Sequence, residues 1–348
     1  MITRELALSN TQFGFLAGAV WVLSFGFMAL FLGSLADRYS RPRIIAGGIL
    51  VWSVCTAASG HVQDFGQMVA ARFFVAAGEA ALVPAATALI AELFDARRRG
   101  TAAGLFFIGI PLGIGCAFLL AGTLGVNLGW RDTFTLLGVL GVLIAIPVGL
   151  VREERTHSPT ERGLPFAAQM RSLIGELRSR PRVRWTLVGF VMTNLIFAGY
   201  TFLQLWLVRE RGIDAAGMAQ RIGLLQILFG TLGAVAGGVL GDRLAGRLPG
   251  GHAGVLLLLT AVCGPLMLAC RIVNPASPWF NIGMAASFFL ALALYGSALA
   301  IIQGELPARL RSTTAGATML CINVFAIALA ARIPASAPSA SPGSVQPA

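Results

Sequence analysis

Ten apolar stretches of about twenty residues constrain this chain more strongly than any other feature of its sequence. A helix of about twenty apolar residues is long enough to cross the hydrocarbon core of a bilayer. The stretches cover residues 12–34, 44–62, 66–91, 101–124, 133–151, 185–208, 219–241, 253–271, 279–302 and 313–331. Because 56% of the 348 residues are hydrophobic and only 12% are charged, a soluble fold could not bury this much apolar surface. We therefore predict an all-α polytopic membrane protein with about ten transmembrane helices.

The arginines indicate how these helices are oriented. All 26 basic residues are arginines and the net charge is +11, which could also suit nucleic-acid binding. However, the arginines lie in short loops between the apolar stretches. Eighteen are in residues 33–43, 92–100, 152–184, 242–252 and 304–312, against seven on the opposite side. Since cytoplasmic loops carry the excess of basic residues, we expect these five loops in the cytoplasm and no nucleic-acid partner. The lysine-free composition, rich in alanine and glycine, indicates a GC-rich bacterial genome and hence a multi-pass protein of the bacterial inner membrane.

Two cytoplasmic motifs occur twice, in the same order. GSLADRYSRPR (33–43) is followed 205 residues later by GVLGDRLAGR (238–247). ELFDARRRGTAAG (92–104) is followed by ELPARLRSTTAG (305–316), 212 residues on at its arginine end. Both copies of each motif lie on the same side of the membrane, which indicates a parallel repeat about an axis normal to the bilayer. Transporters built in this way have their binding site at the interface between the halves.

The repeat divides the chain into two pseudo-symmetric halves of five spans each. We expect an N-terminal half at residues 1–152 and a C-terminal half at residues 185–332. Residues 153–184, the longest polar stretch, are expected to form a cytoplasmic linker. Residues 333–348 are rich in proline, serine and alanine, a composition that predicts a disordered tail.

The repeated motif predicts a conformational latch between the halves. A glycine at position 33 allows a neighbouring backbone to approach closely, and Asp37 is placed to accept hydrogen bonds from a helix N-terminus. By the repeat, the helix that starts near Arg311 and Ser312 is the target of Asp37. The helix that starts near Gly100 is the target of Asp242. The predicted latch consists of Gly33, Asp37, Arg38, Arg41, Arg98, Gly238, Asp242, Arg243 and Arg311. The alternative is that these charges form only a solvated, positive-inside loop.

Two charged residues inside one span predict a binding or proton site. Arg72 and Glu79 are seven residues apart, so they lie on nearly the same helix face, about 10 Å apart along the axis. Ionisable residues inside a membrane are costly and mark functional sites. Glu79 could carry a coupling proton or make a structural contact between helices. Arg72 could line the cavity or extend to the membrane surface.

A polar stripe in the span 185–208 could also line the cavity. Asn194 and Thr201 are seven residues apart, and Gln204 follows three residues later. Ordinary hydrogen bonding between helices explains this stripe equally well.

The sequence contains no signature of a catalytic or nucleotide-binding site. Neither a His-Glu-x-x-His nor a Gly-x-Ser-x-Gly pattern occurs, and no glycine-rich stretch is followed by the Lys-Ser/Thr of a phosphate-binding loop. The five cysteines lie inside apolar stretches and the three histidines are isolated, so we expect no metal and no cofactor. We predict a secondary transporter rather than an enzyme or an ATP-driven pump.

These motifs resemble the major facilitator superfamily over nearly the whole chain. GSLADRYSRPR looks like the family's loop between helices two and three, although Ser40 stands where a glycine is usual. The segments that most resemble the spinster-like branch are WSVCTAASG (52–60), RFFVAAGEAALVPA (72–85), IPLGIG (110–115) and GWRDTF (129–134). Related anion transporters share the Gly-Glu-Ala and Gly-Trp-Arg pieces. The resemblance implies transport by alternating access of a small organic substrate, either amphipathic and lipid-like or anionic. We expect a monomer that contacts the lipid bilayer and the substrate, with H+ as a candidate coupling ion.

The resemblance also exposes a departure. The family has twelve helices, and the loop that contains Asp37 normally follows the second of them. This chain begins just before that helix and runs into the polar tail after the eleventh. A non-transporting fragment of a truncated or frameshifted transporter gene is the alternative to a working transporter. We expect the first and twelfth helices to be missing because the gene model is clipped at its start and shifted or truncated at its end. The alternative is a genuine ten-helix variant.

Overall fold

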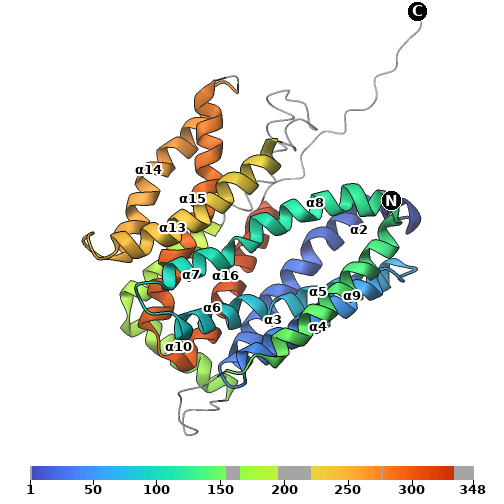
Figure 1. Ribbon diagram of the computed structural model, residues 1–348, viewed down its shortest axis with the longest axis horizontal. Coiled ribbons are helices and arrows are strands. Elements are labelled where there is room, and N and C mark those ends of the chain that lie inside the picture. Colours follow the sequence, from blue (N-terminus) through green and yellow to red (C-terminus); the bar gives the residue numbers. More distant parts are fainter. Residues whose placement is uncertain (1, 154–164, 195–220, 276, 333–348) are drawn as a thin grey trace, which may run out of the picture.

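The computed structural model describes residues 2–153, 165–194, 221–275 and 277–332, in which every regular element is a helix (Figure 1). The labelled elements are α1 (Ile2–Glu5), α2 (Asn10–Gly14), η1 (Phe15–Ala19), α3 (Val20–Ala36), α4 (Arg41–Ser59), α5 (Phe65–Glu79), α6 (Leu82–Leu93), α7 (Arg99–Phe107), α8 (Gly109–Asn127), α9 (Gly129–Leu150), α10 (Phe166–Ser179), η3 (Gln226–Gly230), α13 (Thr231–Leu244), α14 (His252–Ile272), α15 (Pro278–Glu305), η4 (Ala308–Leu310) and α16 (Arg311–Arg332). Residues 181–194 and 221–225 are also helical. The all-α prediction is confirmed.

Seven helical stretches in the described part of the chain are long and apolar enough to cross a membrane. They are Arg41–Ser59, Phe65–Leu93, Arg99–Ala117, Gly129–Leu150, Arg221–Leu244, His252–Ile272 and Pro278–Glu305. Each corresponds to one of the ten predicted spans. The predicted span 12–34 is divided among α2, η1 and the 17-residue α3, and 313–331 falls in the 22-residue α16. The predicted span 185–208 is described only as far as residue 194. The protein is a multi-pass membrane protein.

Proline interrupts the third predicted span near its middle. α5 ends at Glu79 and α6 begins at Leu82, with a turn at Ala80 and Ala81 between them. Pro84 has no N–H to donate to the carbonyl four residues earlier, so the helical hydrogen-bond ladder is broken at this point. The interruption lies directly beside the only acidic residue of the predicted span 66–91.

Two helix pairs join the halves of the repeat. α3 packs along α16, and α13 packs along α7. The pairs correspond through the repeat, because Gly316 lies against the Ala29 carbonyl and Gly104 lies against the equivalent carbonyl, that of Ala234. Small residues at such contacts let helix backbones approach closely within a membrane. In Figure 1 the labels α6, α7, α10 and α16 lie together where the two groups of helices meet.

The GWRDTF motif (129–134) connects several helix ends by hydrogen bonds on the side opposite the repeated loops. Gly129, the first residue of α9, has a φ of +81°, a conformation that favours glycine. Trp130 Nε1 and Arg131 Nε donate to the Glu5 carboxylate at 2.6 and 2.8 Å. Arg131 Nη1 also donates to the Val62 carbonyl at 2.7 Å. The motif therefore connects α1 and the loop after α4 to the start of α9.

The predicted linker contains an amphipathic helix, α10, that contacts both halves. Its apolar residues recur at helical spacing, which explains why one face is buried although the segment is polar overall. Gln169 hydrogen-bonds to Ser34 at the end of α3, and Leu173 is buried. Leu177 packs against a cluster that includes Ile302 of α15. The division of the chain at residues 152 and 185 stays a prediction.

Candidate cytoplasmic latch and intramembrane charges

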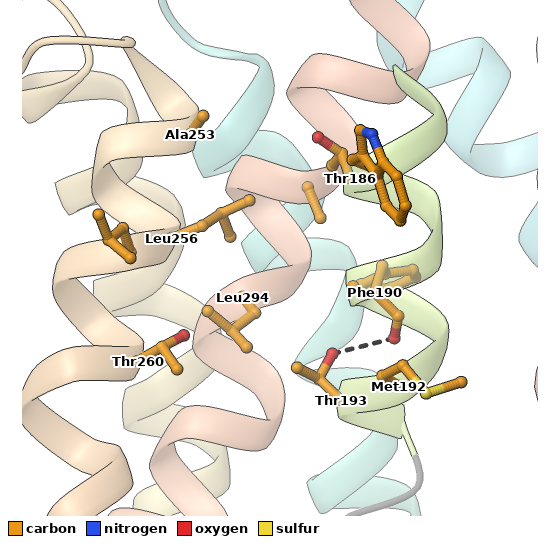
Figure 2. Close-up of a pocket in the computed structure, with 12 residues that line it drawn as sticks. Thr186, Phe190, Met192, Thr193, Ala253, Leu256, Thr260 and Leu294 are labelled. Carbon is orange, nitrogen blue, oxygen red and sulfur yellow. Dashed lines mark hydrogen bonds between the residues drawn. The ribbon is translucent and has the colours of Figure 1, made fainter. Parts of the chain in front are cut away.

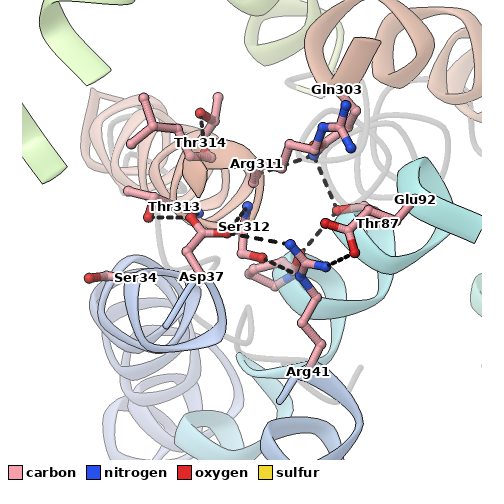
Figure 3. A network of polar contacts seen from close by, with 12 residues as sticks. Ser34, Asp37, Arg41, Thr87, Glu92, Gln303, Arg311, Ser312, Thr313 and Thr314 are labelled. Atoms are coloured by element: carbon pink, nitrogen blue, oxygen red, sulfur yellow. Dashed lines mark hydrogen bonds and ion pairs between the residues drawn. The ribbon is translucent and has the colours of Figure 1, made fainter. Parts of the chain in front are cut away.

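Asp37 accepts three hydrogen bonds from the start of α16. Its Oδ1 accepts from the Ser312 N–H at 2.9 Å, and its Oδ2 accepts from the Thr313 N–H and hydroxyl, both at 2.7 Å (Figure 3). The N–H groups in the first turn of a helix have no intrahelical acceptor, so a carboxylate satisfies them and is favoured by the helix dipole. The Asp37 side chain is fully buried. Burial raises the pKa of this carboxyl to about 6, although the hydrogen bonds from Thr313 and Ser312 oppose the rise.

Asp242 makes the equivalent contact in the other direction between the halves. Its Oδ1 accepts from the Gly100 N–H at 3.0 Å, and its Oδ2 accepts from the Thr101 N–H and hydroxyl, both at 2.7 Å. Asp242 follows Asp37 by 205 residues, and Gly100 and Thr101 precede Ser312 and Thr313 by 212. The two aspartates therefore contact the helix starts that the repeat predicts for them, with the same set of three donors. Their role as a latch stays a prediction.

A glycine beside each aspartate allows the helices to come this close. A Cβ atom at position 33 would lie 2.5 Å from the Ser312 carbonyl oxygen. A Cβ at position 238 would lie 2.5 Å from the carbonyl oxygen of Gly100. Both obstructing atoms belong to the backbone of the opposing helix, so neither contact tolerates a side chain without a shift of the helices.

Arg41 adds a buried ionic cluster to only one of the two contacts. Its guanidinium lies 2.5 Å from Glu92, with Asp37 at 4.0 Å (Figure 3). It also lies 3.1 Å from Glu153. The Arg41 side chain is 3% exposed, so these carboxylates offset a desolvation cost that an unpaired arginine could not meet. The position 205 residues later is Gly246, so the repeat does not extend to this arginine. The predicted latch included Arg41 but neither Glu92 nor Glu153.

The other predicted latch arginines take different positions. Arg38 is half-buried at the end of α3, whereas Arg243 and Arg98 are exposed. Arg99, which was not part of the predicted latch, donates to the Ala91 carbonyl at 2.7 Å. Arg99 immediately precedes Gly100 as Arg311 precedes Ser312. Aligning the two helix starts would therefore have shown that Arg99 is the repeat equivalent of Arg311.

Arg311 lies at the start of α16, where its carbonyl accepts from Gln303 Nε2 at 3.3 Å. Gln303 also donates to the Thr87 hydroxyl at 3.4 Å, which connects α15 to α6. Neither of these partners carries a sequence motif.

Arg72 and Glu79 lie on one helix, as predicted, but contact different partners. Glu79 Oε2 accepts from Trp21 Nε1 of α3 at 2.7 Å. The Arg72 guanidinium lies 5.1 Å from the centre of the Phe134 ring of α9, a cation–π contact. Glu79 is the last residue of α5, directly before the interruption that Pro84 causes. Interrupted membrane helices frequently mark binding sites in transporters, because the break exposes backbone polar groups to a cavity.

Asn194 makes a structural contact within the C-terminal half. Its Oδ1 accepts from the Tyr295 hydroxyl at 2.6 Å, and its Nδ2 donates to the Phe190 carbonyl at 2.8 Å. Tyr295 lies between the rings of Phe107 and Phe190, in a buried cluster that includes residues of α7. This geometry favours the alternative of hydrogen bonding between helices. The other two residues of the predicted stripe, Thr201 and Gln204, lie outside the described residues.

The polar groups of this region can form hydrogen bonds and ion pairs and can exchange protons. Among the residues that the structure describes, no group of three or more His, Cys, Asp or Glu side chains could bind a metal ion.

Comparison with known proteins agrees with this architecture. The model of the Major Facilitator Superfamily matches residues 1–331. An "MFS-type efflux pump" of Mycolicibacterium smegmatis is 31% identical over 280 residues, which cover 78% of this chain and 63% of the relative. "Protein spinster" of Drosophila melanogaster is 28% identical over 335 residues, which cover 92% of this chain and 54% of the relative. The chain thus spans about half to two thirds of the length of these relatives.

A solved structure agrees with the spinster-like resemblance. The bacterial homologue of the human lysosomal transporter Spinster, in an inward-facing and unoccupied conformation, aligns with a TM-score of 0.56 and 25% identity. The alignment covers 93% of this chain and 74% of that one. The resemblance to the spinster-like branch is confirmed, and these relatives are described as transporters rather than enzymes.

Proposed function

Because the chain belongs to the Major Facilitator Superfamily, near its spinster branch, we propose that it is a secondary transporter of the bacterial inner membrane that works by alternating access. The observation that carries this proposal is the pair of equivalent contacts made by Asp37 and Asp242. Each carboxylate crosses from one half to the other, and both belong to loops expected in the cytoplasm. The conformation is therefore one in which the cytoplasmic side is closed.

The two contacts act as a latch that must open in every cycle. A hydrogen bond to a charged group contributes about 1.5–3 kcal/mol to stability, and each aspartate accepts three. Water replaces these donors when the cytoplasmic side opens, so the net cost of opening is much smaller than their sum. This balance keeps both conformations accessible, as alternating access requires.

We propose an amphipathic substrate with one anionic group. Arg72 and Glu79 are the charged residues of the predicted span 66–91, and apolar side chains surround them in the sequence. Arg72 would bind the anion, and the cation–π contact with Phe134 would fix the position of its guanidinium. Glu79, beside the interruption of its helix, would carry the coupling proton. The protein would act as a monomer.

Transport by the reconstituted protein tests the latch. Asp37→Asn replaces one acceptor oxygen by an NH2 group, which faces a donor from Ser312 or Thr313. We expect Asp37→Asn and Asp242→Asn to slow substrate exchange in proteoliposomes while the protein still inserts and remains folded. Asp95→Asn is the matched control, because Asp95 is exposed in a cytoplasmic loop.

Exchange at the wild-type rate in both latch variants would refute the latch. A folded wild-type chain that exchanges none of a panel of amphipathic anions would instead support the alternative of a non-transporting fragment.

A further inference from the structure

Glu79 is hydrogen-bonded to a helix that also packs against the opposite half. Trp21 Nε1 of α3 donates to Glu79 Oε2 at 2.7 Å. Three residues further along α3, the Ser24 hydroxyl donates to the Phe73 carbonyl of α5 at 2.7 Å, which holds the two helices together at this point. α3 also packs along α16. A single helix therefore lies between Glu79 and the opposite half.

An aromatic stack connects Trp21 to the packing between α3 and α16. The centres of the Trp21 and Phe25 rings lie 4.6 Å apart, and the ring planes differ by 20°. Phe25 is buried in a cluster with Ala80, the residue that follows Glu79. Met319 of α16 packs against this cluster. The position of the Trp21 ring therefore depends on where α16 lies.

The strength of the Trp21 hydrogen bond depends on the charge of Glu79. A hydrogen bond to an ionised acceptor is roughly twice as strong as one to a neutral acceptor. Of the described helices that pack against α5, α3 and η1 contain no charged residue, and the two arginines of α4 lie at its cytoplasmic end. Arg72 is the remaining charged group that acts on Glu79. Protonation of Glu79 thus removes the charge that strengthens the bond from Trp21.

The C-terminal half does not repeat this pair. Through the repeat, Gln226 is equivalent to Trp21 and Ala291 is equivalent to Glu79. A cavity of about 500 Å³ lies in that half, and none of its described lining residues is ionisable (Figure 2). Its hydroxyl groups belong to three threonines, and that of Thr193 donates to the Phe190 carbonyl. The repeat therefore places the charge-dependent bond in the N-terminal half and not at the equivalent position of the other.

We propose that Trp21 is a positioning residue that transmits the protonation of Glu79 to the interface between the halves. This inference rests on the proposed function, in which Glu79 carries the coupling proton. When Glu79 is charged, the bond from Trp21 holds the Trp21–Phe25 stack beside the cluster on which α16 packs, and the closed conformation is stabilised. Protonation weakens the bond, so the cytoplasmic side opens more readily.

A double-mutant cycle that measures conformation rather than transport tests this role. Glu79→Gln stands for the protonated side chain, and Trp21→Phe removes the donor but keeps an aromatic ring. Spin labels at the exposed positions 43 and 309, in opposite halves, report the ratio of closed to open molecules. We expect Glu79→Gln to lower this ratio about fivefold, the difference between a charged and a neutral acceptor. Combined with Trp21→Phe, it should cause no further change. An equal fall in both backgrounds would overturn the role of Trp21 and leave Glu79 as the proton site.

Two further variants separate the aromatic path from other effects. Trp279→Phe is the matched control, because Trp279 is exposed near the start of α15, and the fall caused by Glu79→Gln should persist in it. Phe25→Leu removes the stacked ring but keeps an apolar side chain, so it should suppress the response as Trp21→Phe does. A response that survives Phe25→Leu would overturn the path through Phe25. If Glu79→Gln alone leaves the ratio unchanged, the inference fails together with the proton role of Glu79, whereas exchange of substrate by the wild type would still support a transporter.

Discussion

A single methyl group at Gly33 or Gly238 should shift the protein away from the conformation described above. In Gly33→Ala, the new Cβ would lie 2.5 Å from the Ser312 carbonyl oxygen and 3.3 Å from the Pro84 side chain. In Gly238→Ala it would lie 2.5 Å from the Gly100 carbonyl oxygen. Ordinary contacts of a Cβ begin near 3.4 Å, so the helices must separate by about 1 Å. Overpacking of this kind costs about 1–3 kcal/mol.

The whole of this cost falls on the closed conformation, because the contact disappears when the cytoplasmic side opens. We therefore expect the ratio of closed to open molecules to fall by about fivefold to 150-fold. Alanine also stabilises a helix by up to about 1 kcal/mol relative to glycine, but this gain applies to both conformations and cancels in the ratio. Gly47→Ala has the same gain in helix propensity and meets no neighbouring atom, so it is the matched control.

Distances between spin labels at positions 43 and 309 measure this ratio by pulsed electron paramagnetic resonance. Both positions are exposed at cytoplasmic helix ends in opposite halves. The five native cysteines would first be replaced, so that only the labelled sites react. We expect a longer distance to become more populated in Gly33→Ala and Gly238→Ala than in Gly47→Ala. If all three variants give the wild-type distribution, the close approach at these glycines does not control opening.

Three further predictions concern pH, coupling and stability. Because burial raises the Asp37 pKa to about 6 in the closed conformation, above about 3.9 in water, the closed state binds the proton more tightly. The ratio of closed to open molecules should therefore rise about tenfold as the pH falls from 7.5 to 5. A distribution of spin-label distances that does not change with pH would contradict this prediction. Glu79→Gln should abolish proton-driven accumulation of substrate. It should preserve substrate counterflow, because the glutamine oxygen can still accept the hydrogen bond from Trp21. Uptake that stays concentrative and pH-dependent in this variant would exclude Glu79 as the proton site. Tyr295→Phe should lower unfolding stability by about 1–3 kcal/mol by leaving the Asn194 oxygen unpaired, and adding Asn194→Leu should restore part of it; unchanged thermal unfolding of the single variant would argue against this bond.

The sequence by itself determined the class of fold and the pairing of the repeated motifs, and it predicts the orientation in the membrane. Apolar length predicts membrane helices and arginine placement predicts their orientation, because both depend on the free energy of transfer into lipid and not on particular neighbours. The repeat then predicted the partner of each aspartate. An internal repeat carries information on long-range contacts, since each half must make the same contact with the other. For this reason the targets of Asp37 and Asp242 could be named 275 and 142 residues away along the chain.

Only the tertiary structure decided the contacts that have no repeated counterpart. Arg41 is buried among Glu92 and Glu153, although its equivalent position is a glycine. The hydrogen bonds of Glu79 to Trp21 and of Asn194 to Tyr295 join helices whose packing angle the local pattern does not specify. Side-chain partners inside the bundle depend on which helix faces pack together and on how the neighbouring helices are shifted along their axes. In a membrane span nearly every face is apolar, so the periodicity that would identify the buried face of a soluble helix is lost.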